Sequence, residues 1–170
     1  TAPSKPEPEP AEWTSSHAIE VAGSSVEYDA VVGSIILRDD AEKAIAELFY
    51  TAYFRTNGSE TNGRPLVFAY NGGPGSASFW LHMGILGPVR TVVEDLDFTS
   101  TGPFSRVNNE YSILDRADLV MIDPVGTGFS RPIGETKGEA FWGVDQDIAS
   151  VSNFIARYIT DNGRWQSPKY

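Results

Sequence analysis

The sequence predicts an α/β fold with a mostly parallel central sheet that is preceded by antiparallel strands. Two short apolar segments, residues 65–70 (PLVFAY) and 119–122 (LVMI), each end abruptly in a glycine-rich loop. Buried parallel strands have this composition because both faces of their sheet are covered, and such folds place their ligand site at the carboxyl ends of the strands. An amphipathic segment at 143–159 adds a helix to these strands.

The composition is that of an ordinary globular chain, and it excludes several classes of function. A chain of 170 residues is long enough for one compact domain. Its formal net charge of −10 disfavours binding to nucleic acid or to an anionic membrane surface. No apolar run approaches the roughly 20 residues that span a bilayer. Because the sequence has no cysteine, disulfides, thiol catalysis and thiolate metal sites are excluded within it.

Residues 1–12 (TAPSKPEPEPAE) predict an extended and mobile leader. They combine four prolines with small and charged residues, and they offer too little apolar surface to form a core. A mature exported protein whose signal peptide has been removed begins in this way, and so does a shortened chain. We therefore expect a secreted or periplasmic location and a folded domain over residues 13–170.

An antiparallel meander is predicted between the leader and the first parallel strand. Short polar–apolar alternation in residues 17–21 and 25–30, followed by a β-branched run at 31–37 (VVGSIIL), indicates strands with turns at Gly23 and at Asp39-Asp40. Residues 44–55 (AIAELFYTAYFR) also alternate and are rich in aromatic side chains, which favours a strand over a helix. Four apolar residues are expected on one face of that strand: Leu48, Tyr50, Ala52 and Phe54.

The helix predicted at 143–159 is the last clear element. Its apolar residues recur at helical spacing, and they are Val144, Ile148, Val151, Ile155 and Tyr158. Gly163 is a plausible stop signal after it. Residues 167–170 (SPKY) then begin what we expect to be another strand.

The most informative motif is NGGPGSAS at residues 71–78, directly after the first parallel strand. Adjacent glycines allow a sharp turn and a close approach of the backbone to a ligand, so that a backbone N–H can point outward as an oxyanion donor. Asn71 adds an amide that could bind a carboxylate. A tight structural turn without a ligand is the alternative interpretation of this motif.

Two longer segments, 71–90 (NGGPGSASFWLHMGILGPVR) and 118–132 (DLVMIDPVGTGFSRP), together resemble the serine carboxypeptidase family, peptidase family S10. The Asn-Gly-Gly-Pro-Gly loop, the Gly-Pro segment and the Asp-x-Pro-x-Gly-x-Gly-Phe-Ser loop occur in that family in the same order and at similar separations. The resemblance covers residues 65–170. It implies the N-terminal part of an α/β-hydrolase fold.

The resemblance implies roles for three residues of the first loop. Asn71 matches the asparagine that binds the terminal carboxylate of the substrate. Gly73 matches the glycine whose backbone N–H forms half of the oxyanion hole, and Gly72 shapes the loop. The Gly-Glu-Ser-Tyr-Gly nucleophile elbow of the family is expected a few residues after Tyr170. The nucleophile, the triad Asp and the triad His would then all lie outside this sequence.

The expected activity is the removal of C-terminal residues from peptides by a serine-type carboxypeptidase, through an acyl-enzyme. Its partners would be a peptide substrate and the C-terminal remainder of the same protein, with no cofactor and no metal. An esterase or acyltransferase of the same family is an alternative. A further alternative is a catalytically inert fragment that needs a second chain. Oligomeric state is not predicted.

Two departures from the family pattern stand out. Ser76 occupies the position where many eukaryotic members have a cysteine, so their usual cross-link is absent. Ala69 lies where such members often have a tryptophan, which leaves the side-chain preference open. The cysteine-free chain with its proline-rich start resembles a bacterial member of the family.

The other residues that could act in catalysis or metal binding are expected to have structural roles. Ser130 is an unfavourable nucleophile because Pro132 replaces the last glycine of Gly-x-Ser-x-Gly, and either Ser130 or Asp123 is expected to bind backbone. His82 lies in an apolar stretch and is expected to be packed and hydrogen-bonded, and no metal-site spacing exists around it or His17. Most of an aromatic cluster is expected to be core, although it could line a substrate pocket: Phe79, Trp80, Phe129, Phe141 and Trp142. The acidic residues 94–97 are expected in a solvated loop.

Overall fold

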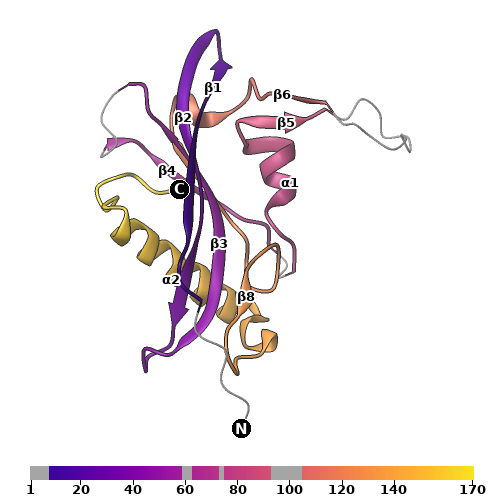
Figure 1. Ribbon diagram of the computed structural model, residues 1–170, viewed down its shortest axis with the longest axis vertical. Helices are drawn as coiled ribbons and strands as arrows, with labels where there is room; N and C mark the ends of the chain where they lie inside the picture. Colours follow the sequence, from indigo (N-terminus) through magenta and orange to yellow (C-terminus); the bar gives the residue numbers. More distant parts are fainter. Residues whose placement is uncertain (1–7, 59–62, 73–74, 93–104) are drawn as a thin grey trace, which may run out of the picture.

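The computed structural model describes residues 8–58, 63–72, 75–92 and 105–170. Its main sheet has the strand order β1-β2-β3-β7-β4, and the short strand β8 also pairs with β3. Two hydrophobic clusters fill the opposite faces of this sheet, and in Figure 1 helices α1 and α2 lie on either side of β3. The elements and their bounds are β1 (Glu12–Val21), β2 (Ser24–Arg38), β3 (Ala44–Arg55), β4 (Leu66–Ala69), α1 (Phe79–Leu81), the π-helical turn η2 (His82–Leu86), β5 (Val89–Thr91), β6 (Arg106–Asn108), the short 3₁₀ turn η3 (Ile113–Asp115), β7 (Asp118–Ile122), β8 (Arg131–Pro132), the 3₁₀ turn η4 (Gly138–Phe141) and α2 (Val144–Asp161).

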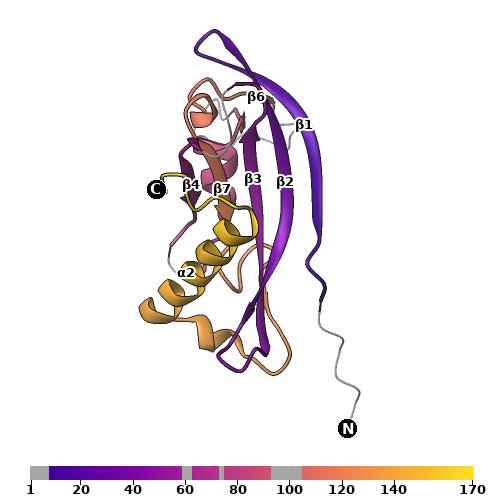
Figure 2. The same ribbon diagram turned by 90° about the vertical axis from the view of Figure 1, so that its left-hand side faces the viewer.

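The predicted meander is confirmed by β1, β2 and β3, which pair antiparallel in sequence order. Figure 2 shows these strands running side by side along the molecule. The first turn has positive φ at both Ala22 and Gly23, which suits a two-residue hairpin turn and explains the glycine signal. At the second turn the Asp39 carboxylate accepts hydrogen bonds from the backbone N–H groups of Ala41 and Lys43. Both predicted turns are therefore present.

Strand β3 shows the predicted division of its faces. Leu48, Tyr50 and Ala52 are buried in the cluster that packs against α2, and Phe54 is partly buried against it. Tyr53 is buried in the opposite cluster. Because alternate side chains of a strand point to opposite faces, β3 separates the two cores.

The parallel part of the sheet is confirmed as well. Strands β4 and β7 pair in parallel, from Leu66 beside Asp118 to Ala69 beside Met121. All five residues of β7 are buried. On the other side of β4, the Leu66 N–H donates to the Pro168 carbonyl at 2.8 Å and the Tyr170 N–H donates to the Leu66 carbonyl at 3.0 Å. Residues 167–170, where a further strand is predicted, therefore lie parallel to β4 and are joined to it by an isolated bridge between Leu66 and Lys169.

Helix α2 begins directly after Gly143, as predicted, but only part of its apolar stripe is buried. Phe154 and Tyr158 pack against the sheet together with Val151. Val144 and Ile148, which the helical spacing also placed on this stripe, are exposed. The predicted apolar face is therefore buried only in its C-terminal part.

The boundary between leader and domain differs slightly from the prediction. Glu12 is the first residue of β1 and pairs with Gly33. Its carboxylate accepts a hydrogen bond from the Tyr50 hydroxyl at 2.9 Å, and the Ala11 carbonyl accepts one from the Ser34 N–H at 3.2 Å. The sheet therefore includes the last residue assigned to the leader, while residues 1–7 lie outside the described part of the chain. No helix in the described part is both long enough and apolar enough to cross a membrane.

Candidate active site

The loops after β4 and β7 meet at the carboxyl ends of these parallel strands. The backbone N–H of Ser78, in the loop that follows β4, donates a hydrogen bond to Asp123 Oδ1 at 2.9 Å. The Ser78 hydroxyl donates to the carbonyl of Ile122, the last residue of β7. Both bonds join the loop that carries the asparagine–glycine motif to the end of the neighbouring strand. The loop that carries the predicted site residues is thus joined to the carboxyl end of the neighbouring parallel strand.

Asn71 follows β4 by two residues and is half-buried. Its Nδ2 donates a hydrogen bond to the Ser76 hydroxyl oxygen at 3.1 Å, across its own loop. A primary amide has two N–H groups, so one of them can hold the loop while the other binds a ligand. Ser76 stands where many eukaryotic members of the family that the motifs resemble have a cysteine. It therefore contacts Asn71, the residue predicted to bind the substrate.

The glycines of the same loop are described only in part. A Cβ placed on Gly72 would meet no atom within 4 Å, so this residue borders open space. Gly73, the predicted oxyanion donor, lies outside the described residues. Its role stays a prediction, as does the role of Gly72 in shaping the loop.

The loop after β7 is built around the Asp123 side chain. Gly126 and Gly128 both have positive φ, which favours glycine. A Cβ on Gly128 would overlap the Asp123 carboxylate. The loop is also closed by Thr127, whose hydroxyl donates to the Pro124 carbonyl at 2.8 Å. These contacts explain why the sequence has glycines at two alternate positions after Asp123-Pro124.

Ser130 has the structural role that the sequence predicted. Its side chain is fully buried. The hydroxyl accepts a hydrogen bond from the Phe49 N–H at 2.8 Å and donates one to the Asp123 carbonyl at 2.6 Å. A hydroxyl that is buried and used in this way joins β3 to the loop after β7 and is not available as a nucleophile.

His82 is packed and hydrogen-bonded, also as predicted. It lies in η2, and its Nε2 contacts the Tyr53 hydroxyl. Burial lowers the pKa of the imidazole, and the Asp123 carboxylate partly opposes this effect. His17 is exposed and contacts the Ser15 hydroxyl through Nε2 at 2.8 Å. Within the described ranges, no group of three or more histidine, aspartate or glutamate side chains is arranged to hold a metal ion.

The aromatic cluster was expected to be mostly core, and this expectation is wrong. Only Phe141 is buried, whereas the other four members have exposed fractions between 53% and 74%: Phe79, Trp80, Phe129 and Trp142. They lie in loops and at helix ends, beyond the two clusters that fill the faces of the sheet. Phe129 also contacts Phe49, with 5.0 Å between the ring centroids. Aromatic composition alone therefore did not distinguish core from surface.

The acidic segment 94–97 (EDLD), which was expected in a solvated loop, lies outside the described part of the chain.

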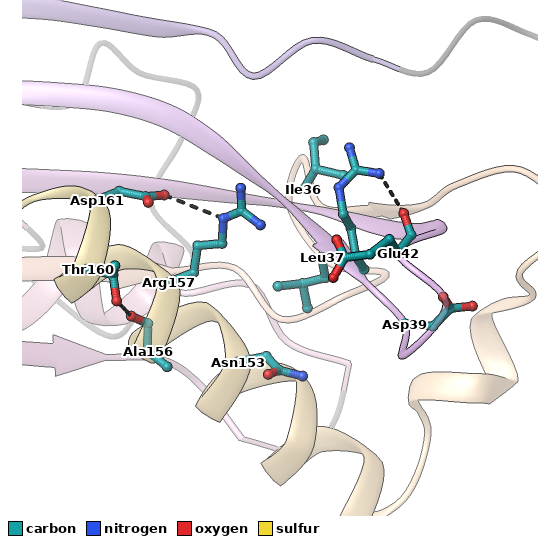
Figure 3. Close-up of a pocket in the computed structure, with 10 residues that line it drawn as sticks. Ile36, Leu37, Asp39, Glu42, Asn153, Ala156, Arg157, Thr160 and Asp161 are labelled. Carbon is teal, nitrogen blue, oxygen red and sulfur yellow. Dashed lines mark hydrogen bonds and ion pairs between the residues drawn. The ribbon is translucent and has the colours of Figure 1, made fainter.

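A separate groove of about 430 Å³ lies between α2 and the end of β2 with the turn that follows it (Figure 3). It is lined by charged and polar side chains such as Asp39, Asn153 and Arg157. Arg157 Nε lies 3.5 Å from Asp161 Oδ2, so the helix side of the groove is occupied by an ion pair. None of the predicted site residues lines it.

A solved structure has an arrangement of strands and helices similar to that of this chain. The chain aligns with the crystal structure of KEX1(delta)p, described as a prohormone-processing carboxypeptidase from Saccharomyces cerevisiae, at a TM-score of 0.54 and 25% sequence identity. The alignment covers 79% of this chain and 28% of that chain. The mixed sheet with its parallel strands β4 and β7 is therefore the N-terminal part of an α/β-hydrolase fold.

The family follows from a sequence model of the serine carboxypeptidases, which matches residues 37–169. The chain belongs to the serine carboxypeptidase family. It is 28% identical over 130 residues to the pheromone-processing carboxypeptidase KEX1 of Saccharomyces cerevisiae, covering 71% of this chain and 16% of that protein. It is 30% identical over 131 residues to serine carboxypeptidase-like 45 of Arabidopsis thaliana, covering 76% of this chain and 25% of that protein.

The chain thus spans no more than about a quarter of the length of these relatives. The family resemblance that the motifs predicted is confirmed. The relatives named here come from a fungus and a plant, and they do not test the prediction of a bacterial-type member.

Sequence reasoning missed the buried charges at the other end of the parallel strands. Asp118 begins β7, and its carboxylate is fully buried between two arginines, Arg64 and Arg164. The available signal was an ionisable residue at the first position of a wholly apolar strand, where a charge must have a partner. The identity of the partners was not predictable, because Arg64 lies 54 residues away in the sequence.

Proposed function

We propose that the complete protein is a serine-type carboxypeptidase that removes C-terminal residues from peptides through an acyl-enzyme. The observation that carries this proposal is the junction of the Asn71 loop with Asp123, at the carboxyl ends of β4 and β7, in a chain of the serine carboxypeptidase family. Ligand sites of open α/β sheets lie at this edge. The nucleophile, the triad Asp and the triad His would be supplied by the C-terminal remainder of the same protein.

Asn71, Gly72 and Gly73 would each contribute to binding the substrate or stabilising the oxyanion. Asn71 would bind the terminal carboxylate of the peptide with an amide N–H, while its contact with Ser76 keeps the loop in place. The Gly73 N–H would stabilise the oxyanion that forms during acyl transfer, and Gly72 would let the backbone approach the substrate. These contacts bind and orient the peptide, and the bond-breaking groups would come from elsewhere.

The position of residues 167–170 supports a nucleophile close to this loop. These residues pair with β4 on the side opposite β7. In the α/β-hydrolase fold the nucleophile follows directly after a strand, on a sharp turn at the same edge of the sheet. A serine placed after this strand would therefore lie next to the loop that contains Asn71.

The isolated chain of residues 1–170 would be inactive under this proposal. Its buried Ser130 and its packed His82 are both engaged in structural contacts. The complete enzyme would need no cofactor and no metal. It would favour acidic pH, because an acid beside the nucleophile would have to be protonated to share the substrate carboxylate with Asn71. Export to a secreted or periplasmic location remains part of the proposal.

An esterase or acyltransferase of the same family would use the same loop, so the test must depend on the free carboxylate. We would compare a blocked dipeptide that has a free C-terminus with the corresponding C-terminal amide, using the complete protein and its Asn71→Ala variant. A lost hydrogen bond to a charged group predicts a fall of roughly tenfold to a hundredfold in kcat/KM for the free acid. Turnover of the amide should change little.

Asn153→Ala is the matched control, because Asn153 is an exposed asparagine on α2 that lines the groove of Figure 3. It should leave both substrates unaffected. Equal losses of the acid and the amide in Asn71→Ala would contradict the proposed role of Asn71. Turnover of esters without turnover of peptides would instead support the esterase alternative.

A further inference from the structure

A buried charge cluster joins the N-terminal ends of three neighbouring parallel segments. Asp118 is the first residue of β7, Arg64 lies two residues before β4, and Arg164 lies three residues before the segment 167–170. Their exposed fractions are 0%, 9% and 3%, in that order. The cluster lies at the opposite end of the strands from Asn71, because parallel strands keep their N-terminal ends together.

Both oxygens of the Asp118 carboxylate lie close to an arginine nitrogen. Arg64 Nε donates to Asp118 Oδ1 at 3.0 Å, and Arg164 Nη2 lies 2.9 Å from Asp118 Oδ2. The backbone N–H of Arg55 also donates to Asp118 Oδ1 at 3.2 Å. Thus one carboxylate joins β3 and β7 to the residues that precede β4 and segment 167–170.

The two guanidinium groups also donate hydrogen bonds to nearby backbone and hydroxyl oxygens. Arg164 Nη2 donates to the Arg64 carbonyl at 3.2 Å, and Arg164 Nε donates to the Ser167 hydroxyl at 2.8 Å. Arg64 Nη2 donates to the Leu114 carbonyl at 3.0 Å. A planar guanidinium with fixed donors is suited to such multiple contacts, whereas an ammonium group is not.

The turn at the end of helix α2 places Arg164 in the cluster. Its end has the hydrogen-bond pattern of a Schellman motif, in which the Arg164 N–H donates to the Ile159 carbonyl at 2.8 Å and Gly163 has positive φ. The turn directs the chain from the helix back toward the sheet. Because Arg164 follows directly after it, the end of α2 and the start of segment 167–170 are both tied to Asp118.

A buried ion cluster of this kind is weak evidence for stability, because desolvation offsets the attraction between its charges. Its effect on register is different. Strand β4 is apolar on both faces (LVFA), so the hydrophobic pattern alone does not penalise a slip of the pairing. A slip of one or two residues would separate the Asp118 carboxylate from its guanidinium partners and leave charges buried and unpaired, which is strongly unfavourable.

We propose that Arg64, Asp118 and Arg164 are positioning residues that fix the register of β7, β4 and segment 167–170. The register in turn sets where the carboxyl end of each strand lies relative to the others. If the proposed function is correct, on which this last step rests, the cluster holds the nucleophile in line with the Asn71 loop from the far end of the sheet.

Hydrogen exchange of backbone amides tests the register directly, without relying on activity. In the complete protein, Arg164→Met should speed exchange at the amides that join β4 to segment 167–170, which are those of Leu66, Phe68 and Tyr170. We expect an increase of about tenfold or more there, with the amides of β2 and β3 changing by about twofold or less. Unchanged exchange at the three amides, or equal acceleration over the whole sheet, would overturn the proposal.

Two further variants keep the test decisive. Arg157→Met removes the exposed arginine of the same helix, whose partner is Asp161, and should leave exchange unchanged. Arg164→Lys keeps the charge and is the milder change if Arg164→Met does not fold. Because lysine cannot make the same set of contacts, it should produce a smaller acceleration at the same three amides. Acceleration by Arg157→Met equal to that by Arg164→Met would contradict a specific role of the cluster.

Kinetics separate this proposal from the proposed function. A shifted nucleophile predicts a lower kcat with little change in KM for Arg164→Met, and partial recovery for Arg164→Lys. If the wild-type complete protein does not hydrolyse peptides at all, the proposed function fails, while the exchange pattern still decides whether the cluster fixes the register. A variant with locally faster exchange but an unchanged kcat would refute the catalytic part alone.

Discussion

The backbone N–H of Ser78 donates a hydrogen bond to Asp123 Oδ1 at 2.9 Å, and this bond joins the loops that follow the two parallel strands of the sheet. The same carboxylate lies where Gly128 leaves room for it. Asp123 is therefore the residue around which both walls of the candidate site are built.

Asp123→Ala should destabilise the protein by about 1–3 kcal/mol, because it leaves the buried Ser78 N–H without its acceptor. Asp123→Asn retains an oxygen at the same position and should lose less. Urea unfolding of the two variants and the wild type measures the difference. Equal stability of Asp123→Ala and the wild type would mean that the bond does not hold the two loops together.

Gly128→Ala should cost clearly more stability than Gly126→Ala. Both glycines have positive φ, which costs an alanine about 1–2 kcal/mol. Only at Gly128 would the added Cβ overlap the Asp123 carboxylate, whereas a Cβ at Gly126 would meet no atom within 4 Å. Thermal or urea unfolding of the two variants provides the comparison. Equal losses would show that the Asp123 side chain does not occupy the space beside Gly128.

His82 should make the protein less stable as the pH falls. Burial lowers the pKa of His82 in the folded state, so the unfolded chain binds the proton more readily. The contribution of neutral His82 to folding is therefore complete above the ordinary histidine pKa of about 6.5 and is lost progressively below it. Unfolding free energies at pH 7.5 and at mildly acidic pH should differ in the wild type.

Two histidine variants isolate this effect. His82→Gln should reduce the pH dependence of stability, because it removes the titrating group. His17→Gln is the control, since it removes an exposed histidine beside Ser15 and keeps His82 in place. A pH dependence that survives His82→Gln in full would assign the effect to other groups.

Ser130→Ala should reduce stability by about 1–3 kcal/mol, because it leaves the Phe49 N–H without the buried hydroxyl that accepts its hydrogen bond. The variant should still react with a serine-directed probe in the complete protein, because the proposed nucleophile is a different serine, C-terminal to Tyr170. Probe labelling followed by urea unfolding checks both statements. Loss of labelling in a folded Ser130→Ala protein would contradict the structural role of Ser130.

Much of the fold was predictable because its signals are local. Alternation along β3 places Leu48 and Tyr50 on one face, since strands have a period of two residues. The apolar runs of β4 and β7 indicate buried parallel strands for a similar reason. The exposed Val144 was not predictable, because helical spacing defines a face but does not say whether anything packs against it.

Sequence motifs predicted which loop carries Asn71, but not which distant residues that loop contacts. Asn71 and its glycines were found from their order after a buried strand, and Asp123 was noted as a backbone partner. The contact between Asp123 and Ser78 joins residues that are 45 positions apart in the sequence. Such pairings depend on how the strands are arranged in space, which no local pattern contains. The arginine partners of Asp118 escaped prediction for the same reason.

We propose above that this chain carries part of the substrate-binding site of a serine carboxypeptidase and that the nucleophile lies outside residues 1–170. The most direct measurement is to treat the complete protein with a serine-reactive phosphonate and to locate the adduct by peptide mass spectrometry. We expect one labelled serine, C-terminal to Tyr170, together with loss of peptide hydrolysis. An adduct on Ser76 or Ser130, or full hydrolysis with no labelled serine, would contradict it.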